Sequence, residues 1–295
     1  MVSRRHVLQQ GPVLRALVEA ALAATRPRPA GSAAGPGPAL TDTVRARPEA
    51  LVRDYVRHCG GDPGWYRGIV PAHLFPQWGF PLLTRTLRAV PYDLRRALNG
   101  GCRIEIHEPL PAGEPLELEA AIEGIDDNGS RAVIRNRLTT GTRSSPRAID
   151  AWMYAVVPLA KSSGAKERPR VPSDAHELGW WKLTPAHAVD FAVLTGDFNP
   201  VHWLAPYARA AGFRNTILHG FATLGRAIEG LNRNRFAGDT SRLAVIDVKF
   251  TRPMVLPASV GLYVRPAEGC TELFVGAGPG GAAMLTGSFQ ERVDG

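Results

Sequence analysis

The sequence repeats one strand pattern, which begins at residue 104 and again at residue 248, an interval of 144 residues. Residues 104–109 and 248–253 each alternate apolar with polar side chains, and each run ends in proline. The next strand recurs at the same interval, since residues 116–120 and 260–264 both place apolar side chains at every second position. Alternation of this kind is typical of half-buried strands. The chain is therefore predicted to contain two copies of one strand-rich unit.

Each copy also has a helical pattern ahead of its strands. In the second copy Thr184 and Pro185 form a helix-start signal, and Gly196 is a stop signal. A longer helix is expected after Gly220. The apolar positions that indicate the helices are Val189, Ala192 and Val193, then Phe221, Leu224, Ile228 and Leu231, and in the first copy Phe80, Leu83 and Leu87.

Turn signals complete both copies. Asn128-Gly129 favours a hairpin in the first copy, and residues 278–281, which are Gly-Pro-Gly-Gly, favour one in the second. A long helix with one apolar face must bury that face, and a curved antiparallel sheet is the available partner. The sequence therefore predicts an α+β fold in which a helix-on-sheet layout occurs twice.

The chain of 295 residues divides into four predicted segments. Residues 26–38 are rich in Pro, Gly and Ala, and residues 161–172 are charged and contain Pro, so both are expected to be connecting segments. The apolar spacing over residues 13–22 predicts a short amphipathic helix. The expected segments are 1–45, the N-terminal helix and its Pro/Gly-rich sequel; 46–160, the first repeat; 161–172, a linker; and 173–295, the second repeat.

The composition and the N-terminal residues indicate the compartment in which the protein resides. Residues 3–8 resemble a twin-arginine export signal, but Arg15 and Glu19 interrupt the apolar region that such a signal needs. No run of eighteen apolar residues occurs, so no membrane span is expected. The three cysteines are odd in number and widely spaced, which suits a reducing compartment. These features predict a cytoplasmic protein.

The chain has a formal net charge of +8 and a calculated pI near 9.9. This charge leaves a polyanion or a phosphate-bearing small molecule open as a partner. The basic residues are scattered, and no nucleic-acid recognition motif accompanies them. We therefore expect no nucleic-acid partner, and a monomer or a homodimer remains open.

The strongest chemical signal is the run 195–202, Thr-Gly-Asp-Phe-Asn-Pro-Val-His. Gly196 allows a sharp turn after a helix, and Asn199 can hydrogen-bond the local backbone before the rigid Pro200. Asp197 and His202 are then expected to lie on the two sides of this turn. A carboxylate and an imidazole held that way can share one water or one substrate proton. No Ser or Cys lies in a nucleophile elbow nearby, so covalent catalysis is not predicted.

A second signal follows seventeen residues later, where His219-Gly220 precedes the long helix of the second copy. Backbone N–H groups at a helix start are unpaired and carry the positive end of the helix dipole. The N–H of Gly220 can therefore stabilise a developing enolate, and the lack of a side chain lets a carbonyl approach closely. A water beside this carbonyl suggests that water is added to, or removed from, the neighbouring carbons.

Several other residues receive structural roles. His219 is expected to have a structural role, because it lies at the start of the long helix. Asp197, His202 and His219 could form a zinc site, but no metal-ligand spacing supports one, and no metal is expected. Trp180 and Trp181 are expected to pack in the core or between the two copies.

The motif resembles the MaoC-like family of (R)-specific enoyl-CoA hydratases and acyl dehydratases, which have the hot-dog fold. The matching stretches are residues 191–202, 207–208, 210–213 and 217–220, with Asn215 departing from an expected Gly. The resemblance implies that Asp197 and His202 are the catalytic pair, that Asn199 supports the turn and the water, and that Gly220 supplies an oxyanion N–H. It also implies a double hot-dog fold.

In the first repeat, residues 54–62 look like a worn copy of residues 190–198, without an Asn-Pro-x-His run. By analogy with the family, this half would be non-catalytic and would shape the acyl tunnel. The implied reaction is the reversible hydration of trans-2-enoyl-CoA to (3R)-3-hydroxyacyl-CoA. It needs no cofactor beyond the coenzyme A of the substrate, whose phosphates the scattered Arg and Lys would meet.

Other functions stay open at this point. The same residues would serve a dehydratase that acts on an acyl carrier protein. A non-catalytic thioester-binding protein is disfavoured, because it would not need the Asp and His together. A thioesterase on the same fold is also disfavoured, because such enzymes generally lack this motif.

Overall fold

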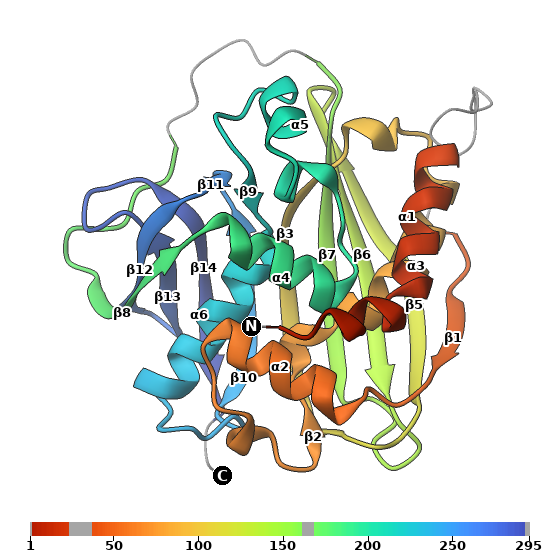
Figure 1. Cartoon of the computed structure of the whole chain (residues 1–295), viewed down its shortest axis with the longest axis horizontal. Coiled ribbons are helices and arrows are strands. Elements are labelled where there is room, and N and C mark those ends of the chain that lie inside the picture. The colour runs from red at the N-terminus through yellow and green to blue at the C-terminus, as the bar shows by residue number, and fades with distance from the viewer. Residues whose placement is uncertain (1, 24–36, 161–167, 293–295) are drawn as a thin grey trace.

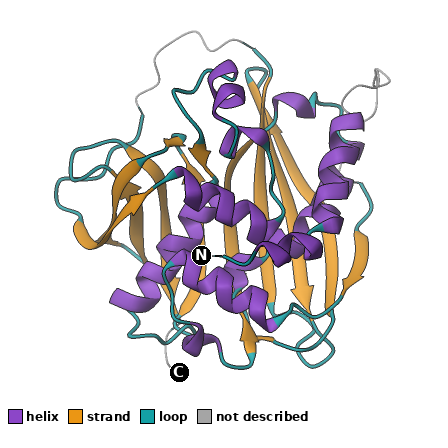
Figure 2. Ribbon diagram, in the orientation of Figure 1, coloured by secondary structure: helices purple, strands orange, loops and turns teal. Residues whose placement is uncertain are grey.

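A computed structural model describes residues 2–23, 37–160 and 168–292 (Figure 1). One ten-stranded antiparallel sheet forms the back of the molecule, and the helices lie against one of its faces (Figure 2). In sheet order the strands are β1 (Leu40–Val44), β5 (Leu116–Asp127), β6 (Arg131–Gly141), β7 (Ile149–Pro158), β3 (Leu98–Ile106), β10 (Leu243–Phe250), β14 (Ala283–Glu291), β13 (Cys270–Gly276), β12 (Ala258–Ala267) and β8 (His176–Leu183).

The α-helices are α1 (Gly11–Ala23), α2 (Glu49–Cys59), α3 (Pro76–Thr86), α4 (Pro185–Thr195), α5 (Ala205–Ala210) and α6 (Gly220–Asn234). Two short ribbons lie outside the large sheet, one of β2 (Ile69–Val70) with β4 (Leu110–Pro111) and one of β9 (Ile217–Leu218) with β11 (Met254–Val255). The 3-10 turns are η1 (Arg4–Gln9), η2 (Pro63–Tyr66), η3 (Ala72–Leu74), η4 (Leu87–Ala89), η5 (Leu94–Arg96) and η6 (Pro200–His202).

The two predicted repeats meet where β3 pairs with β10 at the centre of the sheet. Arg103 lies directly opposite Asp247 in this pairing, and the same two positions are related by the 144-residue interval. Their side chains also approach each other, with 3.7 Å between Arg103 Nη1 and Asp247 Oδ2. Equivalent positions that face each other in an antiparallel pair mark a local two-fold axis. The repeat is therefore present in the fold, and the two sheets form one continuous sheet.

Nearly every element of one half has a counterpart in the other. β4 pairs with β2 as β11 pairs with β9, and Leu110 and Met254, which face Val70 and Leu218, are again 144 residues apart. The predicted hairpins β5–β6 and β13–β14 are both present. Within the described residues, the second half adds α5 and its flanking loop between η6 and β9.

The long helices bury their predicted apolar faces. Leu224, Ile228 and Leu231 of α6 are buried, as is Leu83 of α3. Burying one such side chain contributes about 1.5–3 kcal/mol, so these faces hold the helix layer on the sheet. The chain around α3 is less regular, because Pro81 lies inside the helix and a 3-10 turn precedes it.

The predicted N-terminal helix is present as α1, which packs against α3, while η1 contacts α4. Among the described residues, no helix is long and apolar enough to cross a membrane. Residues 24–36 and 161–167, which hold most of the expected Pro/Gly-rich segment and linker, lie outside the described residues. The four-segment division and the cytoplasmic location stay predictions.

The expectation for the two tryptophans is wrong for one of them. Both lie on β8, which is the outer edge strand of the second half. Trp180 is 44% exposed, whereas Trp181 packs against the core. Because side chains of a strand alternate between its faces, two consecutive residues cannot both point to the helix layer.

Candidate active site

The loop that carries Asp197 begins at a position that only glycine can occupy. α4 ends at Gly196, whose φ of 83° is left-handed. A Cβ at this position would lie 2.8 Å from Cβ of Val13 and 3.1 Å from Cβ of Gln10, so α1 and the residue before it close off the space. Only glycine combines this conformation with this approach. The turn therefore directs the chain sharply out of α4 into Asp197.

Asp197 and Asn199 brace the turn through the backbone. The N–H of Asn199 donates to Asp197 Oδ1 over 3.3 Å, and the N–H of Val201 donates to Asn199 Oδ1 over 3.3 Å. Asn199 thereby caps η6, whose first residue is Pro200. The Asp197 side chain stays 37% exposed, so its second oxygen can reach a ligand.

The neutral ring of His202, the last residue of η6, has its tautomer fixed by one hydrogen bond. Its Nδ1 lies 2.9 Å from the carbonyl oxygen of Ile217 in β9. A carbonyl oxygen only accepts hydrogen bonds, so Nδ1 carries the proton in the neutral ring. Nε2 is then left with a free lone pair, which is the form of imidazole that can take a proton from water.

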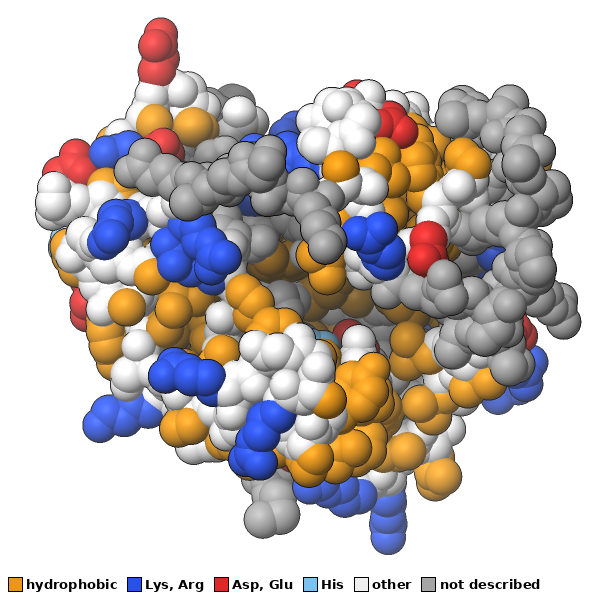
Figure 3. Space-filling model, turned by 90° about the horizontal axis from the view of Figure 1, so that it is seen from above, with side chains coloured by type: hydrophobic (Ala, Val, Ile, Leu, Met, Phe, Trp, Pro, Cys, Tyr) orange, Lys and Arg blue, Asp and Glu red, His pale blue; other side chains and the backbone are white. Residues whose placement is uncertain are grey.

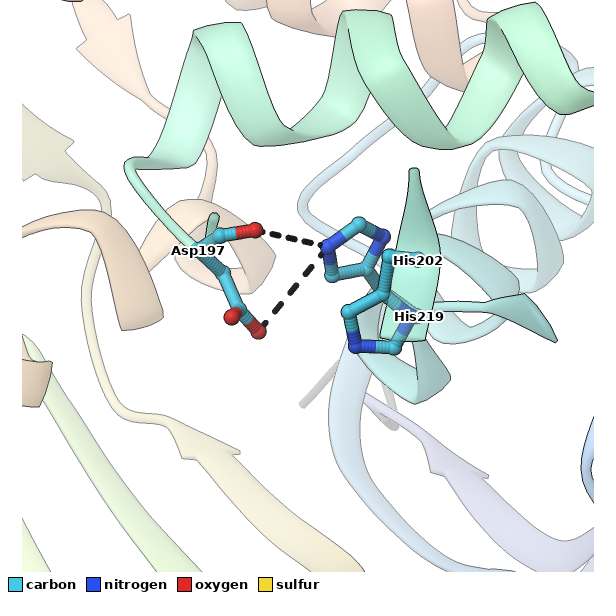
Figure 4. A group of neighbouring side chains, drawn as sticks. All are labelled: Asp197, His202 and His219. Atoms are coloured by element: carbon cyan, nitrogen blue, oxygen red, sulfur yellow. Dashed lines mark hydrogen bonds and ion pairs between the residues drawn. The ribbon is translucent and has the colours of Figure 1, made fainter. Parts of the chain in front are cut away.

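His219 connects the two other side chains (Figure 4). Its ring stacks on that of His202 with 3.6 Å between centroids, and its Nε2–H donates to the backbone oxygen of Asp197 over 2.9 Å. The ring is 2% exposed. Burial first, and then the charge of His202, lower the pKa of His219 to about 4. His219 is therefore neutral near pH 7 and positions the pair that it joins.

Gly220 begins α6 directly after His219. As the first residue of the helix, it has an N–H without an intrahelical acceptor. A Cβ at Gly220 would lie 2.8 Å from the Phe250 ring, so glycine is needed for α6 to approach β10. The structure thus brings the five predicted residues, Gly196, Asp197, Asn199, His202 and Gly220, to two neighbouring chain segments.

The same cluster offers a set of metal ligands. Asp197, His202 and His219 each provide a ligand atom, and these atoms lie within 4.8 Å of one another. However, one nitrogen of each ring faces a backbone carbonyl, 2.9 Å away in both cases. A nitrogen that donates to a carbonyl has no free lone pair, so each ring could bind a metal only through its other nitrogen. The absence of a metal stays a prediction.

The arrangement combines three chemical elements. A partly exposed carboxylate and an unprotonated imidazole nitrogen can hold one water between them and move its protons. The start of α6 presents a free N–H and a positive dipole end beside them. Such a site can add water to, or remove water from, a carbon adjacent to an activated carbonyl group.

Comparison with known proteins agrees with this chemistry. Residues 170–272 match the family model described as MaoC like domain. A peroxisomal enoyl-CoA hydratase 2 of Arabidopsis thaliana is 28% identical over 178 residues, which cover 54% of this chain and 56% of that protein. A 3-hydroxyacyl-thioester dehydratase X of Mycobacterium tuberculosis is 33% identical over 108 residues, covering 37% of this chain and 36% of that protein. The chain spans about half or less of the length of these relatives.

Solved structures share the fold over most of the chain. A MaoC-like dehydratase from Phytophthora capsici superposes with a TM-score of 0.70 at 19% identity, covering 88% of this chain and 97% of that one. A Mycobacterium tuberculosis protein described as a double hotdog fold superposes with a TM-score of 0.53 at 11% identity, covering 87% and 96%. The predicted double hot-dog fold of the α+β class is confirmed.

Proposed function

Because residues 170–272 match the MaoC like domain model and the chain has a double hot-dog fold, we propose that this chain catalyses the reversible hydration of a trans-2-enoyl-CoA to a (3R)-3-hydroxyacyl-CoA. The observation that supports it most directly is the hydrogen bond between His202 Nδ1 and the Ile217 oxygen. That bond leaves Nε2 as a base in the same cluster as the Asp197 carboxylate.

In the hydration direction, a water held between Asp197 and His202 Nε2 attacks C3 of the enoyl group. The oxygen–C3 bond forms as the C2–C3 π bond breaks. One water proton goes to the Asp197–His202 pair, and the pair supplies a proton to C2. The negative charge that develops on the thioester oxygen accepts a hydrogen bond from the Gly220 N–H. Dehydration is the same sequence in reverse, and coenzyme A enters only as part of the substrate.

The surface near the site suits an acyl thioester. Trp203, Leu204 and Tyr207 are exposed and follow His202 directly in the chain. Figure 3 shows hydrophobic side chains around a hollow in the upper face of the molecule, with Lys and Arg side chains near its rim. Apolar walls with cations at the edge fit a molecule that has an aliphatic chain and a phosphorylated carrier.

The test is an assay of the purified protein with crotonyl-CoA and with a medium-chain trans-2-enoyl-CoA, following loss of the conjugated thioester absorbance. Asp197→Asn and His202→Ala are each expected to lower kcat/KM by about 10²–10⁴-fold, because each removes one group of the acid/base pair.

Asp62→Asn is the matched control, since it makes the same carboxylate-to-amide change at an exposed cap of the first half. It should leave the rate unchanged. A wild-type protein that is folded but inactive on both thioesters would contradict the proposal for coenzyme A substrates.

A dehydratase that acts on a carrier protein is the second candidate. The exposed Trp203, Leu204 and Tyr207 favour it, because they lie between η6 and β9, where the described first half has no matching helix, and a carrier protein could dock there. The discriminating measurement compares kcat/KM for one 3-hydroxyacyl group on coenzyme A and on an acyl carrier protein. Tyr207→Ser should lower only the rate with the carrier protein if this candidate is right.

A further inference from the structure

A cavity of about 110 Å³ lies among η3, the β2–β4 ribbon, the centre of the sheet and the C-terminal half of α6. Its wall is largely aliphatic and includes Val70 of β2 together with Ile104 and Ile246, which are paired between β3 and β10. Ile228 and Asn232 are four residues apart on α6, so the same face of this helix closes the cavity. None of the side chains of the candidate active site belongs to this wall.

The cavity reaches the surface on one side. Glu108 and Arg292 belong to its lining and are exposed. The Arg292 guanidinium donates to the backbone oxygens of Ile106 and His107, and Glu108 accepts from the Ser145 hydroxyl. The charged groups at the opening are therefore already bonded to the protein, and they do not select for a charged ligand.

The polar part of the wall contains an acceptor that lacks a donor. Asn232 is 1% exposed, and its Nδ2 donates to Glu229 Oε2 over 3.2 Å and to Tyr66 Oη over 2.8 Å. An ionised carboxylate only accepts hydrogen bonds, so the amide nitrogen must face Glu229, and this fixes the orientation of the amide. Oδ1 of Asn232 is left buried without a donor among the described residues. A ligand that brings a donor into the cavity would remove the cost of this unpaired acceptor.

The neighbouring carboxylate already has its own partners. Glu229 is buried, and its Oε1 lies 3.2 Å from Nε2 of His73, which is another lining residue. Its Oε2 accepts from Asn232. A charged ligand would therefore enter an aliphatic space without a free counter-ion, which is costly. A neutral ligand with a single donor is the chemistry that fits.

We propose that this cavity binds a short, neutral aliphatic alcohol, whose hydroxyl donates to Asn232 Oδ1 and whose carbon chain lies against Ile104 and Ile246. A cavity of about 150 Å³ holds one benzene molecule, so this volume suits about four or five non-hydrogen atoms. 1-Butanol has that size and a single donor. The proposal does not rest on the hydratase reaction, because the cavity shares no residue with the Asp197–His202 pair.

The first test compares two isomers that differ in their donor. 1-Butanol can donate a hydrogen bond, whereas methyl propyl ether has the same formula and cannot. Titrations of the wild-type protein, followed by the methyl NMR signals of Ile104, Ile228 and Ile246, should show that butanol binds about threefold to tenfold more tightly. The methyl signals of Ile134, which lies in a separate core cluster, should not move. Equal affinities for the two isomers, or no shift at the cavity, overturn the proposal.

Variants then identify the acceptor. Asn232→Leu should make the two affinities equal, because it removes Oδ1. The matched control is Asn234→Leu on the same helix, since Asn234 is exposed and bonds the Gly230 oxygen, and it should keep the full preference for butanol. Val70→Phe places a larger side chain in the wall and should abolish binding of both isomers, which tests the site even if Asn232→Leu does not fold. A preference for butanol that survives in a folded Asn232→Leu variant overturns the proposal.

Kinetics separate this cavity from the candidate active site. At concentrations that saturate the methyl shifts, butanol should not compete with crotonyl-CoA. Competitive inhibition that Val70→Phe removes would make the cavity part of the acyl-binding space and would overturn a separate site. The NMR titrations need no catalytic activity, so a failure of the proposed function leaves their outcome unaffected.

Discussion

The two halves build the same turn after their first helix, but only the second half places an acid and a base on it. α2 ends at Gly60 with φ 92°, as α4 ends at Gly196 with φ 83°. In both halves an Asp or Asn then caps a 3-10 turn that starts with proline, Asp62 with η2 and Asn199 with η6. The second half needs one more residue to reach its cap, and Asp197 lies in this longer stretch.

This comparison corrects the sequence alignment of residues 54–62 with 190–198, which sets Asp62 against Phe198. The structure sets Asp62 against Asn199, so that Trp65 takes the place of His202. Through the β2 and β9 pairings, Pro71 takes the place of His219. The turn is thus a feature of the fold, and the chemistry that we propose for the second half depends on one added residue and two histidines.

The first half still has a cavity at its counterpart of the candidate site. The cavity measures about 110 Å³, and its walls include Val70, Ile104 and Leu110. Its polar edge holds His73 and Asn232, which belong to a buried network with Glu229. The first half therefore has a cavity in this region, but within the described residues its polar lining does not contain an acid/base pair like Asp197 and His202.

The largest effect on stability is expected from alanine at the two helix-ending glycines. Both substitutions put a side chain at a left-handed φ, which costs about 1–2 kcal/mol. Gly60→Ala meets open space, whereas Gly196→Ala also collides with Val13. Overpacking adds about 1–3 kcal/mol, so Gly196→Ala should lose about 2–5 kcal/mol in urea unfolding. Equal losses in the two variants would show that Val13 of α1 does not restrict the space at the turn that begins with Gly196.

Features encoded over a few neighbouring residues could be predicted from the sequence. The end of α4 at Gly196, the start of α6 at Gly220 and the hairpin at Asn128-Gly129 rest on local backbone preferences and are all present. The repeat was also predictable, because the alternation of apolar residues survives in both copies. These signals were sufficient for the fold class and for the residues that now lie together.

Features that depend on distant contacts could not be predicted. The stacking of His219 on His202 joins residues seventeen positions apart through two separate elements. Gln10 reaches the end of α4 across the whole first half of the chain. Strand β8 was not predicted from the sequence, because it is an edge strand with mostly exposed side chains, and this weakens its apolar pattern. Side-chain contacts of this kind leave no periodic trace in a single sequence.

Acid should weaken both halves through one buried histidine each, His58 and His219. Their pKa values are lowered to about 3 and about 4, below the ordinary 6.5 that the unfolded chain recovers. Between pH 6.5 and pH 4 these two histidines are therefore protonated in the unfolded state but not in the folded state. The free energy of unfolding falls as the pH is lowered through this range. At pH 5 each histidine should account for about 2 kcal/mol of that loss.

The measurement is urea unfolding between pH 7 and pH 5 in a buffer without phosphate. His58→Phe should remove about half of the loss with acid, since Phe cannot take up a proton and fits beside Phe191, whose ring centroid lies 6.1 Å from that of His58. An unchanged pH dependence in this variant would show that His58 is protonated equally in both states.

The smallest predicted effect compares two buried amides that hold the last turn of a helix. Gln10 Nε2 donates to the oxygen of Leu194 at the end of α4 over 3.0 Å, and Asn136 Nδ2 donates to the oxygen of Leu83 in α3 over 2.9 Å. Gln10→Met leaves the Leu194 carbonyl unsatisfied and should cost about 1–3 kcal/mol of stability. Asn136→Leu removes one donor from the Leu83 oxygen, which keeps the Thr86 hydroxyl as a donor, and should cost about 0.5–1.5 kcal/mol.

Only the end of α4 leads into Asp197, so only Gln10→Met should lower kcat, by about tenfold, with KM unchanged. The reason is geometric: Gln10 also packs beside Gly196, and its amide oxygen accepts from Gln77 of α3, which links the catalytic turn to the first half. Equal kcat values in the two variants at matched stability would show that the turn keeps its position without this link. A loss in Gln10→Met alone would show that the first half contributes to the proposed reaction by holding Asp197 in place.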